Sequence, residues 1–185
     1  YGHDYWDGDR RFGYGGYTYI PDRWKGVAKK IINEYQLNNK SKLLDLGCGK
    51  GYLLHEIKLL LPEITITGID ISNYAIKNST SLIKPFLKNY DVRKKLPFSD
   101  NSYDLVITLG LLHNFKLNDL EQSIHEIERI GKNKYIMVES YKNELELFNL
   151  QCWALTAESF FDKDEWITLL KMFKYTGDYE FIYFK

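Results

Sequence analysis

The chain has 185 residues, 44% of them apolar, which suits one α/β domain with a proper core and is short for two. Its 25 lysines and arginines balance 25 aspartates and glutamates, and this zero net charge argues against nucleic acid as a partner, because such affinity depends on many phosphate contacts. No apolar stretch reaches membrane-spanning length and no signal peptide is visible, so we expect a cytoplasmic protein without a membrane partner.

Residues 1–21 form an arm in which no helical or strand period fits. Aromatic residues are interleaved with glycines, which bend the chain, and the large aromatic surfaces must be buried against something. We expect the arm to pack over the sheet or to act as a lid that excludes water from an active site, and the two interpretations are compatible. Its aromatic residues are Tyr1, Tyr5, Trp6, Phe12, Tyr14, Tyr17 and Tyr19.

The next segments alternate between helix and strand patterns. An apolar stripe predicts a helix over residues 22–35, and the short apolar run 42–46 predicts a buried parallel strand. Residues 47–51 carry three alternating glycines, and apolar residues at helical spacing follow over 52–61. Strand, glycine turn and helix together make the first half of a βαβ unit.

The glycine turn indicates a ligand that lies against the backbone, because side chains there would collide with it. The dinucleotide fingerprint is Gly-x-Gly-x-x-Gly. Here the third glycine comes one place early, at Gly51, and Tyr52 stands where the fingerprint needs glycine.

An acid follows the turn at the distance expected for a ribose contact. A second strand, predicted over residues 63–70, ends in Asp70, about 20 residues beyond the glycines, where a carboxylate can accept hydrogen bonds from both ribose hydroxyls. The alternative is a glycine turn that only packs helix against strand, and the placement of Asp70 favours the ligand site.

The rest of the chain continues the alternation. Residues 175–178 suit a tight hairpin into a final aromatic strand over 179–184, so we expect that strand to be antiparallel. The fold class is therefore α/β, doubly wound and Rossmann-like, with a mostly parallel sheet in a single domain, 1–185. The intervening elements are a helix over 73–83, a short strand within 86–92, a strand over 105–109, a helix from 118 or 119 to 130, a strand over 135–139, an irregular segment over 142–161 and a helix from 162 or 164 to 172.

The spacing Asp45-x-Gly47-x-Gly49-x-Gly51 resembles the first motif of class I S-adenosylmethionine (SAM) methyltransferases, in the small-molecule branch. The likeness covers nearly the whole chain after the arm. It implies that SAM is the cofactor, with S-adenosylhomocysteine as product, and that Asp91 binds the adenine amine, although an ordinary turn or cap role for Asp91 stays open. The implied cofactor-binding residues are Asp45, Gly47, Gly49, Gly51, Asp70, Ile71, Asp91, Val92, Leu109 and Tyr17.

Candidate catalytic residues follow the fourth and fifth predicted strands, at the carboxyl edge where open α/β sheets bind ligands. A neutral imidazole can remove the proton of a hydroxyl near pH 7, so His113 is the predicted general base, with Glu139 as the reserve. A role for His113 in shaping the pocket alone stays open. The predicted acceptor contacts are Tyr14, Trp24, Glu139 and Tyr141, and no metal site is predicted.

The resemblance implies methyl transfer to a small-molecule acceptor, and we expect an oxygen nucleophile. The aromatic arm also looks like that of small methyltransferases of sugar and surface-polysaccharide biosynthesis. The Asn-Pro-Pro-Tyr type motif of nucleobase methyltransferases is absent after the fourth strand, which argues against DNA and RNA as substrates. Two alternatives remain: an NAD-dependent oxidoreductase, which Tyr52 counts against, and a non-catalytic SAM-binding module.

Overall fold

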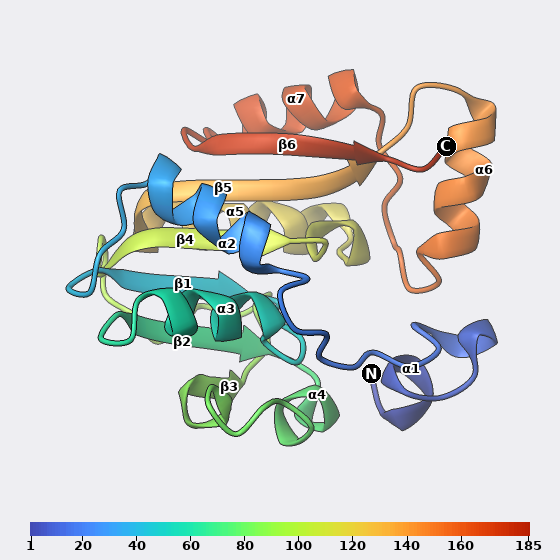
Figure 1. Ribbon diagram of the computed structural model, residues 1–185. Helices are drawn as coiled ribbons and strands as arrows, with labels where there is room; N and C mark the ends of the chain where they lie inside the picture. Colours follow the sequence, from blue (N-terminus) through green and yellow to red (C-terminus); the bar gives the residue numbers. More distant parts are fainter.

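The protein is built around one twisted sheet of six parallel strands, as a computed structural model of residues 1–185 shows (Figure 1). The strand order is β3-β2-β1-β4-β5-β6, so the chain reverses its direction of winding between β1 and β4. In open sheets of this kind, ligands bind at that reversal, outside the carboxyl ends of the strands. The strands are β1 Lys42–Leu46, β2 Thr65–Asp70, β3 Leu87–Asn89, β4 Tyr103–Leu109, β5 Gly131–Ser140 and β6 Asp178–Tyr183.

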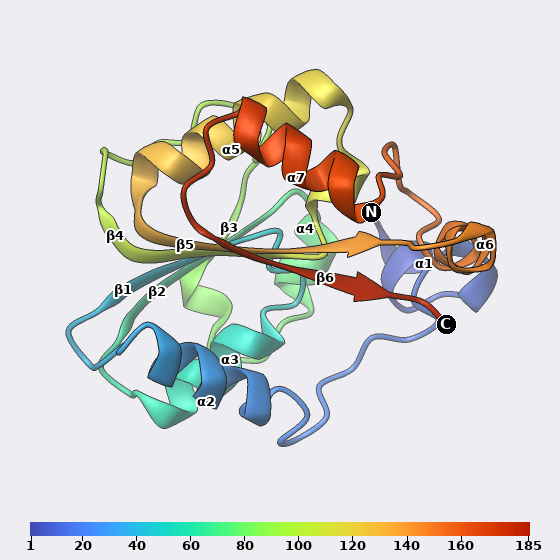
Figure 2. The same ribbon diagram turned by 90° about the horizontal axis from the view of Figure 1, so that it is seen from above.

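Helices cover both faces of the sheet (Figure 2): α2 and α3 lie on one face, and α5 and α7 on the other. Both views place α1 and α6 beyond the carboxyl ends of the strands instead. None of the helices is long and apolar enough to span a bilayer. The helices are α1 His3–Trp6, α2 Lys25–Glu34, α3 Tyr52–Leu60, α4 Asn73–Lys77, α5 Leu117–Ile130, α6 Glu144–Trp153 and α7 Lys163–Met172.

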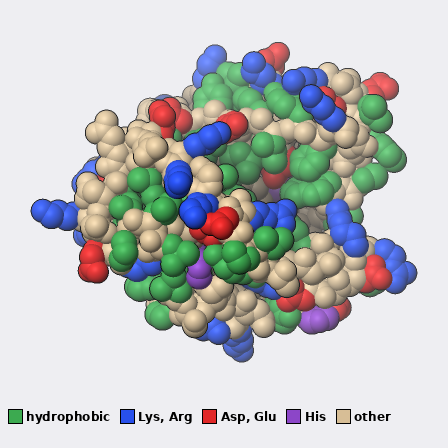
Figure 3. Space-filling view, in the orientation of Figure 1, with side chains coloured by type: hydrophobic (Ala, Val, Ile, Leu, Met, Phe, Trp, Pro, Cys, Tyr) green, Lys and Arg blue, Asp and Glu red, His purple; other side chains and the backbone are tan.

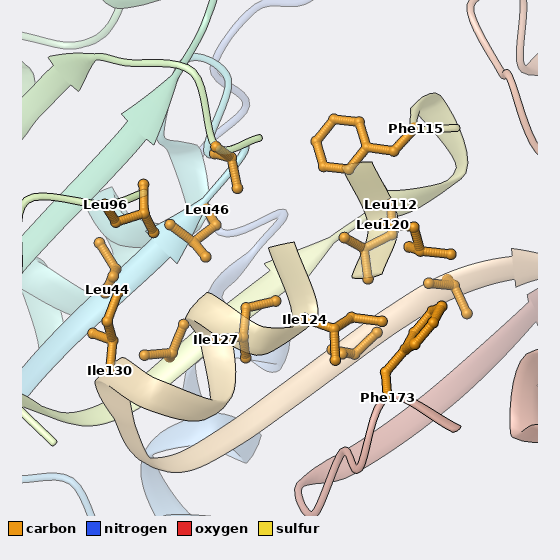
Figure 4. Packing of buried hydrophobic residues seen from close by; sticks show 14 of the residues in the cluster. Leu44, Leu46, Leu96, Leu112, Phe115, Leu120, Ile124, Ile127, Ile130 and Phe173 are labelled. Atoms are coloured by element: carbon orange, nitrogen blue, oxygen red, sulfur yellow. The ribbon is translucent and has the colours of Figure 1, made fainter. Parts of the chain in front are cut away.

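Two apolar clusters, one on each face, hold the sheet in place. Ile124 and Ile127 of α5 pack toward Leu44 and Leu46 of β1 in the larger cluster (Figure 4). Burial of each such side chain stabilises the fold by about 1.5–3 kcal/mol. The smaller cluster joins α2 and α3 to the opposite face. The sheet is therefore fixed from both sides, and its carboxyl edge is left to loops.

The predicted antiparallel C-terminal strand is wrong. β6 pairs with β5 in parallel, with Ile182 opposite Glu139. Parallel neighbours need a long crossover connection, and α7 supplies it by returning the chain across the sheet before β6 begins. Residues 175–178 turn into β6 but form no hairpin, because the partner strand ended before α6.

Other predicted boundaries differ for local reasons. α2 begins at Lys25 because Asp22 adopts a left-handed backbone, with φ of 64°. The segment 142–161 contains a regular helix, α6, capped by the Asn143 side chain. Its pattern was obscured because apolar residues lie on more than one face: Leu150 is buried, whereas Phe148 is exposed.

Candidate active site

A large cavity, with a volume of about 550 Å³, opens at the carboxyl ends of the strands. The ends of β1, β2, β4 and β5 contribute to it, together with the arm and α6. Figure 3 shows the hollow, with hydrophobic side chains gathered around it. Its volume falls in the range of about 300–1,000 Å³ that is typical of small-molecule sites.

The cavity brings together residues that are far apart in the sequence. Most predicted site residues line it, from both the cofactor set and the acceptor set. They are Tyr14, Tyr17, Trp24, Asp45, Gly47, Gly49, Asp70, Ile71, Asp91, Val92, Leu109 and Glu139.

Three predicted residues do not line this cavity. Gly51 stands at the start of α3 with φ of 70°, and a Cβ there would lie 2.6 Å from Ile83 Cδ1, so its role in the structure is packing. Tyr141 follows β5 and is half-buried outside the cavity. His113 lines a second, smaller cavity described below.

The glycine loop is shaped to be covered by the arm. Gly49 has φ of 56°, and a Cβ at this position would lie 2.8 Å from the Trp6 indole of the arm. The Gly49 N–H donates to Asp70 Oδ2 at 2.8 Å, which ties the loop after β1 to the end of β2. A larger residue at position 49 would therefore displace the arm.

Asp45 is a buried carboxylate without a partner. Its side chain lines the cavity, the residue is 5% exposed, and no hydrogen bond or ion pair engages the carboxylate. Burial first, and then the nearby charge of Asp70, raise the pKa of Asp45 to about 7. Such a group favours a ligand that brings positive charge to it.

Asp70 is held in position by the backbone. Its Oδ1 accepts from the Ser72 N–H at 2.7 Å, and its Oδ2 accepts from Gly49. Burial raises the pKa of Asp70, although the two backbone hydrogen bonds act in the opposite direction. The remaining lone pairs are available to ligand hydroxyls, because each carboxylate oxygen can accept more than one hydrogen bond.

Asp91 and Ile71 stand at the side of the cavity nearest β2 and β3. The Arg93 guanidinium donates to both Asp91 oxygens at 2.9 Å, and these bonds hold the pKa of Asp91 below its usual value. Ile71, directly after Asp70, is 44% exposed although it is apolar, so it offers a surface for a flat ring. The adenine contact of Asp91 stays a prediction.

At the opposite side, His113 and Glu139 form a buried pair in which His113 Nδ1 contacts Glu139 Oε2. The two residues come from the segment after β4 and from the end of β5. The Glu158 and Ser159 N–H groups bind the His113 carbonyl, and Trp166 Nε1 donates to the Glu139 carbonyl. The backbone at both positions is therefore fixed, as a proton-transfer group requires.

The arm is fastened by Lys50, from the middle of the glycine loop. The Lys50 ammonium, whose side chain is 3% exposed, donates to both Asp7 oxygens and to the Tyr17 carbonyl at 2.7–2.8 Å. Tyr74 adds a hydrogen bond to Asp7, and Tyr52 adds one to the Tyr17 carbonyl. The arm therefore covers the glycine loop through charge-assisted hydrogen bonds, which are the stronger kind.

The sequence did not predict the roles of Lys50, Trp153 and Arg23 at this site. Lys50 carried no pattern of its own, because its partner Asp7 is distant in the sequence. Trp153 belongs to α6, whose helical period was not recognised. Arg23 lines the cavity and makes no ion pair. The sequence carried no signal for this, because an acid, Asp22, stands next to Arg23 and pairs with Lys25 in the structure.

Comparison with known proteins now defines the class. The chain matches the methyltransferase domain family over residues 37–177 and belongs to that family. It is 32% identical over 117 residues to the mouse mitochondrial arginine-hydroxylase NDUFAF5, covering 63% of this chain and 33% of that protein. It is 27% identical over 128 residues to the malonyl-[acyl-carrier protein] O-methyltransferase of Bacillus anthracis, covering 64% of this chain and 46% of that protein.

The [4+2]-cyclase SpnF shares the fold, with a TM-score of 0.64 and 20% identity over 91% of this chain and 61% of that chain. The predicted class is therefore confirmed: the protein is a class I SAM-dependent methyltransferase domain, with SAM as its cofactor. The chain spans about a third to a half of the curated relatives described above. Their names cover different reactions, so the acceptor has to be argued from the site.

The first prediction concerns Asp45 and pH. A cationic ligand favours the ionised carboxylate, so binding of SAM should release a proton wherever Asp45 is protonated in the free protein. Because the Asp45 pKa is raised to about 7, SAM affinity should fall by about tenfold for each pH unit below that value. Calorimetry between pH 5.5 and 7 measures this slope.

Asp45→Asn is the matched variant, since it keeps the size of the side chain and removes the charge. This variant should bind SAM more weakly at pH 7, and its SAM affinity should depend less steeply on pH. The pH dependence that remains should come from Asp70. Equal slopes for the two proteins would mean that Asp45 does not meet the positive charge of the cofactor.

The second prediction is that the arm acts as a lid. Binding of SAM or its product should slow hydrogen exchange in residues 1–20, because the arm lies over the cavity. Lys50→Met removes a charged donor worth about 1.5–3 kcal/mol per hydrogen bond, so arm amides should exchange about tenfold faster or more in this variant. Amides of β4 are the internal control. Equal hydrogen exchange in the arm with and without ligand would mean that the arm only packs against the domain and does not act as a lid.

Proposed function

We propose that the protein transfers the methyl group of SAM to an oxygen atom of a small-molecule acceptor bound beside Glu139. The observation that carries this proposal is the buried His113–Glu139 pair, of which Glu139 lines the cavity. A hydroxyl must lose its proton when it is methylated, and a buried acid–imidazole pair is a means of accepting it.

The cavity residues fit SAM as a ligand. Asp45 and Asp70 are carboxylates that no lysine or arginine neutralises, and SAM carries a sulfonium and an ammonium group. Arg23, without an ion pair at the cavity, suits the carboxylate of the cofactor. When bound, SAM supplies an already activated methyl group.

The protein residues then have two tasks. They must align the acceptor oxygen, which contributes up to about 7–11 kcal/mol when alignment is good, and they must exclude water, which the arm does by covering the glycine loop. Neither task needs a nucleophile from the protein.

The acceptor region has aromatic and aliphatic walls. Trp153 and Ile182 line the cavity near Glu139, and Ile182 is the register partner of Glu139 in the sheet. Tyr14 and Trp24 close the cavity from the arm and from the start of α2. Such walls stack on the apolar face of a sugar or on an aromatic ring, so both remain acceptor classes for testing.

An NAD-dependent oxidoreductase is the alternative that the strand order alone permits, since dinucleotide-binding folds use the same order. The buried Asp45 counts against it. A dinucleotide brings a negatively charged pyrophosphate to the glycine loop, where the carboxylate of Asp45 would repel it; Asp70 does not discriminate, because an acid at this place also binds the ribose of NAD. Tyr52 also occupies the place of the third glycine and binds the arm through its hydroxyl group.

Turnover is the direct test. The purified protein should release S-adenosylhomocysteine from SAM slowly on its own, and faster with a suitable hydroxyl compound from a panel of phenols and glycosides. Asp70→Ala serves as the control for contaminating activity. SAM binding without any release in the whole panel would favour the non-catalytic SAM-binding module, and NAD reduction would favour the oxidoreductase.

A further inference from the structure

We propose that Glu139, rather than His113, faces the acceptor and takes its proton, while His113 is a positioning residue that meets solvent through the second cavity. This assignment rests on the proposed function, because it describes how that same site handles the proton of a hydroxyl acceptor. It reverses the order of the two candidates that the sequence supports.

Glu139 lines the large cavity, and His113 does not. The Glu139 side chain is only 1% exposed, and its Oε2 is engaged by His113. Its other oxygen, Oε1, has no hydrogen-bond partner in the protein. A Cβ at Gly110, another cavity residue, would lie 3.0 Å from that oxygen. The unpartnered oxygen therefore lies beside the cavity residue that directly follows β4, where an acceptor would approach.

Gly110 supports this placement independently. It has φ of 68°, in the region that favours glycine, and the one atom that a Cβ there would approach is Glu139 Oε1. The sharp turn after β4 thus leaves room for the carboxylate oxygen at the cavity wall. A side chain at position 110 would push Glu139 away from this position.

His113 instead faces a second cavity of about 90 Å³. Tyr14 and Trp153 line both cavities, so they form part of the wall between them. With Nδ1 committed to Glu139, the free nitrogen of His113 is Nε2, which has no protein partner. The small cavity is large enough for several water molecules, and Arg10 and Thr156 give it polar groups.

The proton step follows from this arrangement. As the acceptor oxygen bonds to the methyl carbon, the carbon–sulfur bond breaks and its electron pair stays on sulfur. The acceptor proton moves to Glu139 Oε1, and it leaves to water after the product dissociates. His113 donates from Nδ1 to Oε2 throughout, which holds Oε1 toward the acceptor. No oxidant, reductant or second cofactor is needed.

A series of variants separates the two roles. The readout is basal release of S-adenosylhomocysteine with water as acceptor, repeated with catechol as a probe hydroxyl. Glu139→Gln should lower the rate by about 10²–10⁴, the usual loss for a general base. His113→Asn should stay within about tenfold of the unmodified protein, because its amide can donate to Oε2 in place of Nδ1. His113→Ala should lose about 10², as misplaced catalytic groups do.

Glu126→Gln is the matched control. It removes another buried carboxylate, which pairs with Arg129 on α5 away from the cavity, and it should keep the basal rate. SAM affinity should be unchanged in the Glu139 and His113 variants. Equal large losses for His113→Asn and His113→Ala, with a smaller loss for Glu139→Gln, would overturn the assignment and make His113 the base.

A second measurement tests which nitrogen of His113 donates to Glu139 and does not depend on catalytic turnover. Its outcome therefore separates this inference from the proposed function. Nitrogen-15 NMR of the imidazole rings should show His113 protonated at Nδ1 and not at Nε2 at neutral pH, and Glu139→Gln should change this pattern. The opposite tautomer, with the proton on Nε2, would contradict the donor role of His113. Failure of all basal release alongside the expected tautomer would contradict the methyl-transfer proposal alone.

Discussion

The site depends on two carboxylates that are buried together and that pair with no lysine or arginine. Asp45 lies near the end of β1 and Asp70 ends β2. Burial raises the pKa of both, and the charge of Asp70 raises that of Asp45 further. The buried ammonium of Lys50, in the glycine loop, is already committed to Asp7. Asp70 accepts hydrogen bonds from two backbone N–H groups, whereas Asp45 has no partner. Because an unpaired buried charge is costly, a positively charged ligand would stabilise this edge of the sheet. SAM carries such charge, whereas the pyrophosphate of a dinucleotide is anionic.

The rest of the structure keeps this edge in place and covers it. Both faces of the sheet are packed by helices, so the carboxyl ends of the strands cannot shift far. The arm then closes over the glycine loop through Lys50 and through Trp6, whose indole N–H donates to Ser72 Oγ. Ser72 is also the residue whose N–H binds Asp70. The arm and the predicted ribose contact are therefore joined through one residue, Ser72.

Local patterns predicted most of the fold, because the glycine loop, the helix stripes and the apolar strands are each encoded in neighbouring residues. The glycine spacing and Asp70 indicated for the same reason residues that the structure brings together at one cavity, and their contacts with the cofactor stay a prediction. The direction of β6 was predicted wrongly because it depends on the strand with which β6 pairs, and this strand, β5, is distant in the sequence. The turn pattern of residues 175–178 suggested a hairpin, but no strand directly precedes these residues.

The acceptor side was harder to predict, because its residues are joined by contacts between distant segments. His113 and Glu139 were each recognised as residues at the sheet edge, but the sequence could not show that they touch or which of them faces the cavity. Lys50 and Trp153 acquire their roles from the arm and α6, neither of which has a regular pattern in the sequence. Cytoplasmic location and the exclusion of nucleic acid stay predictions.

Calorimetric titration with SAM and with NAD tests the central account most directly. The protein should bind SAM and show no heat of binding with NAD, because the buried Asp45 carboxylate attracts the cationic ligand and repels the anionic one. Asp70→Ala removes charged hydrogen bonds worth about 1.5–3 kcal/mol each, so its affinity for SAM should fall at least about tenfold. NAD binding as tight as that of SAM, or unchanged SAM affinity in a folded Asp70→Ala protein, would contradict the account.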